Sequence, residues 1–251
     1  MDLVPRPIPS GIVSSASIVN GLMSIVIPVY NEAGKIGNDI QSVCGYFKKD
    51  FELIVINDGS TDKTEQILNS YMKKISQLKV IHYAPNRGKG FAVKTGVLTA
   101  RGEWILFADA GGCVPFSDVE QGLKLIRAGA DVAIGSRHLR DSMIKKPQRL
   151  YRQWGGTLFR KIVRTLFSIG DIQDTQCGFK LFKHQAARSL FSTQKIEKFM
   201  FDLEWIQKAV YSGMDLKEFP VHWNSDGDSR FNPTSGGLRT LLDLARIKAQ
   251  L

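Results

Sequence analysis

Short runs rich in β-branched and aromatic residues recur along the first half of the chain and alternate with stretches of helical periodicity. The runs are MSIVIPVY (23–30), FELIVIND (51–58), LKVIHYA (78–84), EWILFADA (103–110) and ADVAIGSR (130–137). The helical stretches between them span 33–48, 62–75, 88–100 and 117–128. Strands that alternate with helices of about 10–15 residues are typical of βαβ units. The pattern therefore predicts an α/β fold with a mostly parallel central sheet flanked by helices.

The second half of the chain is less regular. Its periodicity predicts a helix over 148–168, a strand at 177–182, helices near 183–191 and 200–212, a strand at 216–223 and a final amphipathic helix from about 237 to 251. The sequence contains no internal repeat and no low-complexity tract. With 251 residues, 43% of them apolar, the chain is long enough to bury one sizeable core, so we expect a single domain.

The N-terminal part and the cysteines bear on location. The longest apolar run, LMSIVIPVY (22–30), has about half of the roughly 20 residues that a membrane-spanning helix needs. Residues 1–22 carry prolines where a signal peptide would need its apolar core, so we expect a flexible leader. Cys44, Cys113 and Cys177 share no metal-ligand spacing, which favours a reducing, cytoplasmic compartment.

The net charge of +10 is unevenly distributed, because seven Lys or Arg residues and no acid lie between residues 142 and 170. In this segment Tyr151, Trp154, Leu158, Ile162 and Leu166 follow helical spacing, and the arginines are offset from them. A basic amphipathic helix over 148–168 lying on an anionic membrane is one interpretation, and an ordinary surface helix is the other. Nucleic acid is not an expected partner, since the aromatic residues lie on the apolar stripe and form no open stacking platform.

Polar residues follow five of the predicted strands. They are Asn31-Glu32, Asp58-Gly59-Ser60, Asn86-Arg87-Gly88-Lys89-Gly90, Asp109 and Ser136-Arg137. Ligands of parallel sheets bind beyond the carboxyl ends of the strands. Carboxylates beside glycines and basic residues suit the hydroxyls and phosphates of a nucleotide diphosphate. Neither the P-loop nor the dinucleotide glycine pattern is present, which disfavours ATP hydrolysis and hydride transfer.

The segments SIVIPVYNEAGKI, ELIVINDGSTDKT, NRGKGFAVKTGVLTARGEWILFADA, GSR and DTQCGFKLF resemble the serial motifs of family-two inverting glycosyltransferases with the GT-A fold. Within that family the chain resembles the dolichyl-phosphate and polyprenyl-phosphate β-glucosyltransferases. The resemblance covers roughly residues 23–223 and implies a GT-A domain over 23–251. Residues 23–137 would form the nucleotide-sugar-binding half, and residues 138–251 the acceptor half with the basic segment 148–168.

The resemblance also implies roles for individual residues. Those bordering the nucleotide sugar would be Pro28, Tyr30, Asn31, Glu32, Asp58, Gly59, Ser60, Asn86, Arg87, Gly88, Lys89, Ala108, Asp109 and Ala110. Those in the catalytic centre would be Asp109, Arg137, Asp174 and Gln176, with Phe179 nearby and with Asp202 and Glu204 closing the pocket from behind. Those binding the acceptor phosphate would be Arg137, Arg149, Arg152 and Arg230.

A metal ion is implied, but the sequence departs from the family at that point. Asp109 matches the first acid of the D-x-D motif, and Gly111 stands in the place of the second. Mg²⁺ or Mn²⁺ is often held by one or two carboxylates together with phosphate oxygens, so Asp109 can still hold an ion, more weakly. Alternatively, Arg87, Lys89 and Arg137 stabilise the leaving diphosphate, or the protein binds a donor without turnover.

The expected activity is transfer of glucose from UDP-glucose to a dolichyl or polyprenyl phosphate with inversion, at the cytosolic face of a membrane. A phosphate acceptor is already ionised near neutral pH, so no strong general base is needed. The alternatives are another nucleotide sugar, or a soluble hydroxyl acceptor that needs a base such as Asp174. The partners are thus a UDP-sugar donor and a lipid-phosphate acceptor, with peripheral membrane contact.

Overall fold

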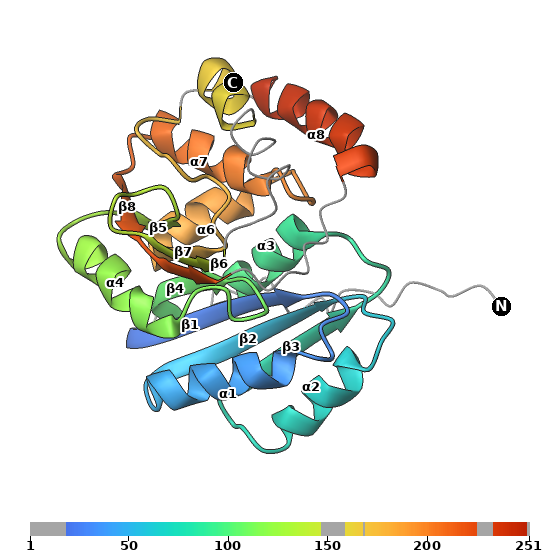
Figure 1. Ribbon diagram of the computed structural model, residues 1–251. Coiled ribbons are helices and arrows are strands. Elements are labelled where there is room, and N and C mark those ends of the chain that lie inside the picture. Colours follow the sequence, from blue (N-terminus) through green and yellow to red (C-terminus); the bar gives the residue numbers. More distant parts are fainter. Residues whose placement is uncertain (1–18, 147–158, 168, 225–232, 250–251) are drawn as a thin grey trace.

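The computed structural model describes residues 19–146, 159–167, 169–224 and 233–249. Its centre is a seven-stranded sheet with the order β3-β2-β1-β4-β7-β5-β8 (Figure 1). The strands are β1 (Val19–Val29), β2 (Phe51–Asp58), β3 (Leu78–Tyr83), β4 (Gly102–Ala108), β5 (Val132–Ser136), β7 (Phe179–Lys183) and β8 (Leu216–Pro220). Within this sheet β7 runs antiparallel to β4 and β5, and the other neighbours are parallel. The carboxyl ends of β1 to β5 therefore lie on one edge.

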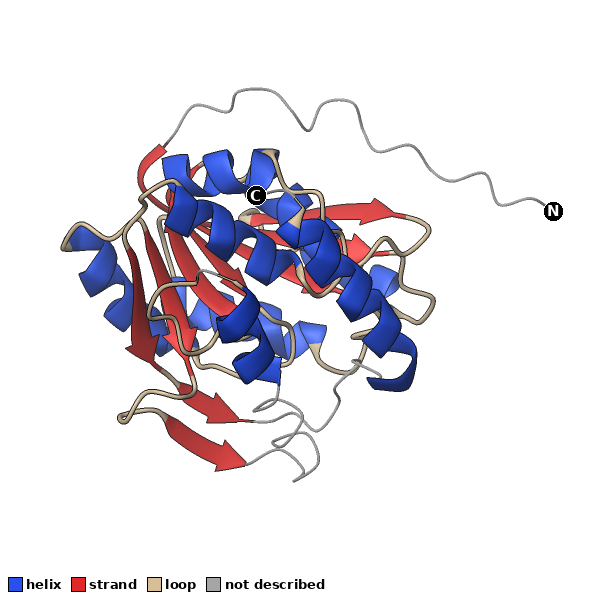
Figure 2. Ribbon diagram, turned by 90° about the horizontal axis from the view of Figure 1, so that it is seen from above, coloured by secondary structure: helices blue, strands red, loops and turns tan. Residues whose placement is uncertain are grey.

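Helices cover both faces of the sheet, as Figures 1 and 2 show. One face carries α1 (Ile36–Phe47), α2 (Thr64–Met72) and α4 (Val119–Arg127), with the short 3-10 helix η1 (Phe116–Asp118). The other face carries α3 (Lys89–Thr99), α6 (His184–Ser192), α7 (Phe201–Tyr211), α8 (Pro233–Lys248) and a helix over residues 159–166. Each face has its own buried apolar cluster. The central strands are apolar on both sides for this reason, and all eight residues of β2 are buried.

A second sheet has two short parallel strands, β6 (Met143–Lys146) and β9 (His222–Asn224). It lies beside the main sheet (Figure 2). The hydrophobic pattern did not predict β6, and the strand predicted at 216–223 is divided between β8 and β9.

The predicted α/β fold with a single domain is confirmed, and the strands of the first half lie close to their predicted positions. β1 begins at Val19, inside the leader predicted over 1–22, and residues 1–18 lie outside the described part. Most of the basic segment 148–168 is also outside it, and its described end forms the helix over 159–166. Within the described ranges, no helix combines the length and apolarity needed to cross a membrane.

Candidate active site

The loops after β1 and β2 are joined by hydrogen bonds between the predicted nucleoside residues. The backbone N–H of Asn31 donates to Ser60 Oγ at 2.8 Å, and Asn31 Oδ1 accepts from the backbone N–H of Thr61 at 2.7 Å. Asn31 has a φ of 54°, in the left-handed region that Asn tolerates better than most residues. Pro28 and Tyr30 flank this junction at the end of β1, with Tyr30 exposed. The structure therefore brings these residues to one edge of the sheet.

Asp58 ends β2 and organises the loop after β3. One oxygen of its buried carboxylate accepts from the backbone N–H of Arg87 at 2.7 Å, and the other from Gly88 at 2.9 Å and from Asn86 Nδ2 at 2.8 Å. Burial raises the pKa of Asp58, and these bonds oppose the shift. Its direct contact with a nucleoside stays a prediction, because in this structure the carboxylate fixes residues 86–88.

The loop 86–88 leads into α3, so the start of this helix lies at the same edge of the sheet as the ends of β1 and β2. Gly88, which precedes the helix, has a φ of 116°. A side chain there would lie 2.7 Å from Glu197 O, and one at Gly90 would lie 2.7 Å from Ile196 O. Both positions therefore need glycine so that α3 can approach residues 196–198. A helix N-terminus carries a partial positive charge and attracts phosphate, and the first turn of α3 contains no acidic residue.

Lys89, the first residue of α3, forms an ion pair with Asp109 at the end of β4. Lys89 Nζ lies 2.7 Å from one carboxylate oxygen and 2.9 Å from the other. Burial lowers the pKa of Lys89, but the charges of Asp109 and Asp202 outweigh it, and the net shift is upward. Asp109 is further fixed by its backbone N–H, which donates to Gly178 O at 2.8 Å. A side chain at Gly178 would overlap the Asp109 carboxylate.

Gly111, in the place of the second acid of the D-x-D motif, has a φ of 96° and donates its N–H to Asp39 Oδ2 at 2.9 Å. The described residues bring no three His, Cys, Asp or Glu side chains together around a possible ion. Asp109 nevertheless remains about one-third exposed, and a single carboxylate completed by diphosphate oxygens and water is a donor set that Mg²⁺ accepts. The residues fit a weakly held ion. The Asp109 carboxylate would then have to interact with both the ion and Lys89.

Arg137 and Asp174 form the second charged pair of the site. Arg137 Nε and Nη2 donate to the two oxygens of Asp174 at 2.7 and 2.8 Å, and the backbone N–H of Arg137 adds a third bond. Glu218 accepts from the backbone N–H groups of Asp174 and Gln173, at 2.9 and 2.8 Å. Burial would raise the pKa of Asp174, but the Arg137 guanidinium and its hydrogen bonds hold it well below its usual range.

These pairings limit what the site can do. A general base needs a pKa near the working pH and an oxygen able to reach the proton. Asp174 has a lowered pKa, and Arg137 engages both of its oxygens. Burial raises the pKa of the Cys177 thiol to about 12, so this neighbour is a poor nucleophile at neutral pH. The site favours charge stabilisation over proton abstraction or covalent catalysis.

Comparison with known proteins decides the family. Residues 24–191 match the family model described as glycosyl transferase family 2. The chain belongs to this family. This glycosyltransferase is 34% identical over 237 residues to a dolichyl-phosphate beta-glucosyltransferase of Trichomonas vaginalis, covering 89% of this chain and 70% of that protein. It is 34% identical over 255 residues to the dolichyl-phosphate beta-glucosyltransferase of Dictyostelium discoideum, covering 96% and 78%, and 33% over 246 residues to that of Homo sapiens, covering 90% and 74%.

Solved structures show the same GT-A fold at low identity. Glucosyl-3-phosphoglycerate synthase of Mycobacterium tuberculosis, solved with Mn²⁺ and uridine-diphosphate-glucose, superposes with a TM-score of 0.69 at 15% identity, covering 92% of this chain and 79% of that chain. A mannosyltransferase of Pyrobaculum calidifontis, in complex with GDP-Man and Mn²⁺, gives 0.59 at 18%, covering 90% and 61%. These likenesses establish the fold of the glycosyltransferase.

Several predicted site residues of the glycosyltransferase have a clear position and others do not. Ala108 is buried at the end of β4, and Ala110 follows Asp109 in a partly buried position. The backbone N–H of Gln176 donates to Asp174 Oδ1 at 3.2 Å. Arg87 pairs with Glu197 and stacks on Phe91, with its guanidinium carbon 3.4 Å from the ring centre. Arg149, Arg152 and Arg230 lie outside the described residues.

The structure also adds groups that the sequence did not single out. They are Asp39, Gly178, Lys180, Glu197 and Glu218, each described by its contact with a predicted residue. Lys180, fully buried, pairs at 2.7 Å with Asp202 behind the Lys89–Asp109 pair. His222, at the start of β9, has its Nδ1 2.9 Å from Asp118 Oδ1. Lys180 could have been singled out from the sequence, because a charged residue within the apolar run CGFKLF (177–182) needs a partner of opposite charge when the strand is buried.

Proposed function

We propose that this glycosyltransferase transfers glucose from UDP-glucose to the phosphate of a dolichyl or polyprenyl phosphate, with inversion at the sugar carbon. The relatives at 32–35% identity carry the name dolichyl-phosphate beta-glucosyltransferase, which supports a lipid-phosphate acceptor and glucose. The structural neighbour crystallised with uridine-diphosphate-glucose and Mn²⁺ supports the donor and a divalent ion. In this proposal residues 23–137 bind the donor and residues 138–251 receive the acceptor.

The observation that carries the proposal is the Arg137–Asp174 pair. A hydroxyl acceptor has to lose its proton during transfer and needs a base. Asp174, the acid that the sequence offered for this role, is buried and bound through both oxygens to Arg137. A phosphate monoester has a second pKa of about 6 and brings an anionic oxygen of its own. A site without a competent base at Asp174 thus suits a phosphate acceptor.

The reaction is then a single displacement. An oxygen of the acceptor phosphate attacks C1 of glucose from the face opposite UDP, and the bond between C1 and the diphosphate oxygen breaks with its electron pair remaining on UDP. The start of α3 and Lys89 would stabilise the charge on the departing diphosphate. Asp109 and the diphosphate oxygens would hold Mg²⁺ or Mn²⁺, which supplies further charge neutralisation at the leaving group. Because one displacement inverts the α-linked donor, the product is β-linked.

We further propose that the protein works at the cytosolic face of a membrane, where the basic segment 148–168 lies near the lipid. Seven Lys or Arg residues and no acid between residues 142 and 170 support contact with anionic lipid headgroups.

A matched pair of acceptors tests the function. The protein would be incubated with labelled UDP-glucose, Mg²⁺ or Mn²⁺, and either a short polyprenyl phosphate or the polyprenol of the same length. We expect labelled lipid only from the phosphate. Equal transfer to the polyprenol would favour the hydroxyl-acceptor alternative, and no lipid product with or without metal would contradict the proposal. GDP-mannose, offered in parallel, tests the choice of donor.

A further inference from the structure

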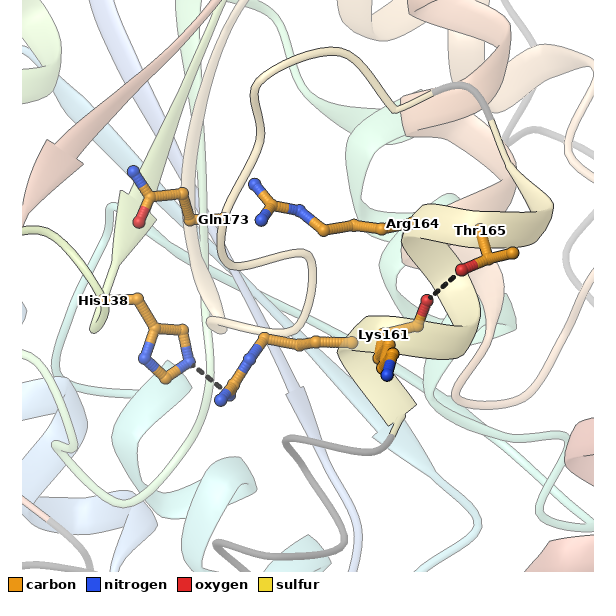
Figure 3. A pocket seen from close by; sticks show the side chains of 6 residues that line it. His138, Lys161, Arg164, Thr165 and Gln173 are labelled. Carbon is orange, nitrogen blue, oxygen red and sulfur yellow. Dashed lines mark hydrogen bonds between the residues drawn. The ribbon is translucent and has the colours of Figure 1, made fainter.

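A basic pocket lies next to the Arg137–Asp174 pair, and none of its described lining residues is among those assigned above to the donor. It has a volume of about 450 Å³, within the range of about 300–1,000 Å³ typical of small-ligand sites. Its described lining residues are His138, Arg160, Lys161, Arg164, Thr165 and Gln173 (Figure 3). Three of these six carry a positive charge and none is acidic.

The pocket lies beside the predicted catalytic centre, because two of its lining residues are neighbours in sequence of Arg137 and Asp174. His138 directly follows Arg137, and Gln173 directly precedes Asp174. Two acids beside the pocket are already engaged, Asp174 with Arg137 and Glu218 with the backbone N–H groups of Gln173 and Asp174. They are therefore poorly placed to neutralise the cations on the opposite wall.

That wall is the helix over residues 159–166. Arg160 and Arg164 are one helical turn apart, and like charges at this spacing repel each other. Arg160 Nη1 lies 2.7 Å from His138 Nε2, and Arg164 extends from the helix toward Gln173 (Figure 3). A guanidinium is a planar fork of N–H donors that matches the oxygens of a phosphate, and the lining of this pocket contains two of them.

The contact between Arg160 and His138 fixes the state of the imidazole. Arginine has donors and no acceptor, so Nε2 must accept and the proton of a neutral His138 is on Nδ1. Burial lowers the pKa of His138, and the nearby Arg160 and Arg137 charges lower it further against the opposing effect of Asp174. His138 therefore adds no positive charge at neutral pH, and it orients Arg160 at the pocket wall.

We infer that this pocket binds a phosphate monoester, with Arg160 and Arg164 contacting its oxygens and His138 orienting Arg160. The inference rests on the proposed function, in which the phosphate is that of the lipid acceptor. The acceptor phosphate would then contact Arg160 and Arg164 as well as Arg137. The family resemblance assigned only Arg137 of these three to the phosphate. Lys161 and Thr165 also line the pocket, and Thr165 Oγ1 donates to the carbonyl of Lys161 at 2.9 Å.

Calorimetric titration without donor tests the site separately from turnover. The probes are farnesyl phosphate, inorganic phosphate and farnesol, and the variants are R160Q/R164Q and a control, K73Q/K74Q, that removes two exposed charges after α2. We expect R160Q/R164Q to weaken the binding of both phosphates by about tenfold or more, K73Q/K74Q to leave it unchanged, and farnesol binding not to respond to either. Equal affinities of the two double variants for farnesyl phosphate would overturn the site.

Four further measurements separate a phosphate site from misfolding and from general membrane binding. Thermal unfolding of R160Q/R164Q checks its fold, and Arg164→Lys, which keeps the charge and loses the fork, should give an intermediate affinity. Vesicles of phosphatidylserine contain no phosphate monoester, so an R160Q/R164Q defect confined to vesicle binding would overturn the site in favour of a membrane surface. In turnover, we expect a raised KM for the lipid phosphate at an unchanged KM for UDP-glucose.

The site and the proposed function can fail independently. If farnesyl phosphate binds and R160Q/R164Q loses it, but no sugar is transferred to lipid, the site stands and the function does not. If sugar is transferred with the same KM for lipid phosphate in R160Q/R164Q and in the wild type, the function stands and the site is overturned.

Discussion

Asp174 is the residue whose environment most limits the chemistry of the site. Replacing it with Asn leaves the Arg137 guanidinium without its counter-charge, and breaking a buried pair in this way costs about 3–5 kcal/mol. Because Arg137 is still about one-fifth exposed, we expect the lower end of this range. Urea unfolding of Asp174→Asn and of the wild type at pH 7 measures the difference.

The same comparison has a defined pH dependence. The folded-state pKa of Asp174 is lowered, so its contribution is complete above the unfolded value of about 3.9 and is lost as the pH falls toward the folded value. The stability gap between wild type and Asp174→Asn should therefore narrow below about pH 4. If the difference in unfolding free energy stayed constant or grew as the pH fell, the ionised Asp174 would not be the source of the stabilisation.

Lys180 and Asp202 form a fully buried pair on β7 and α7. Lys180→Met leaves the Asp202 carboxylate buried without its cation, and we expect a loss of about 3–5 kcal/mol. Replacing both by apolar residues, as in K180M/D202L, should restore much of the loss, since no uncompensated charge remains. Urea unfolding of the single and double variants measures this, and strictly additive losses would show that the pair is not coupled.

Gly111 allows the single-acid metal site to be tested. Gly111→Asp supplies the acid of the D-x-D motif, and Gly111→Asn is a control with the same shape and the same strain at a φ of 96°. We expect Gly111→Asp to lower the Mg²⁺ or Mn²⁺ concentration for half-maximal transfer roughly tenfold relative to Gly111→Asn, because a second carboxylate adds a charged ligand. Identical metal curves for the two variants would place the ion away from Asp109.

The residue types of the site were predictable from the sequence, but their partners were not. Polar residues at successive strand ends pointed to Asp109, Lys89 and Arg137. The Lys89–Asp109 and Arg137–Asp174 pairs join residues 20 and 37 positions apart, and no local pattern specifies such a pairing. Glu218 was missed for the same reason, since an acid on an edge strand looks like any solvated residue.

At the scale of elements, α3, the helix that we assign to the donor diphosphate, packs closely on its neighbours because two of its residues, Gly90 and Gly96, are glycines. A side chain at Gly96 would lie 2.3 Å from Val26 Cγ1 on β1, whereas one at Gly45 in α1 would meet nothing within 4 Å. We expect Gly96→Ala to destabilise by about 1–3 kcal/mol through overpacking. Gly45→Ala should stabilise by about 0.5–1 kcal/mol through helix propensity. Urea unfolding compares them, and stabilisation by both would show that α3 can shift without cost.

Most elements of the first half were predictable because the central strands there are apolar on both faces and most of the helices have one buried face. The strand β6 was not, since its pairing with β9 joins residues about 80 apart and two of its side chains, Met143 and Ile144, are exposed. The position of β7, antiparallel between β4 and β5, could not be predicted either, because hydrophobic periodicity does not specify the order or direction of strands in a sheet. That insertion is what carries Gly178 and Lys180 to the Asp109 side of the site.

At the scale of the whole molecule, the sheet edge connects the groups that we assign to the donor, at β1 to β4, with the Arg137–Asp174 pair at β5. The proposed donor side contains the N-terminus of α3 and Lys89, and the pocket beside the pair is lined by Arg160 and Arg164. In the proposed reaction the glucose C1 would lie between these two positive regions, which suits transfer from one phosphate to another. The prediction of a glycosyltransferase is confirmed by the family, while the acceptor and the stereochemistry remain the proposal.

The most direct test of that proposal is the structure of the product. Glucose labelled with ¹³C at C1 would be transferred from UDP-glucose to a short polyprenyl phosphate, and the purified lipid examined by NMR. We predict a β-configured C1 coupled to phosphorus, which would establish both the phosphate acceptor and inversion. An α-configured product, or a glucosyl lipid whose C1 shows no coupling to phosphorus, would contradict it.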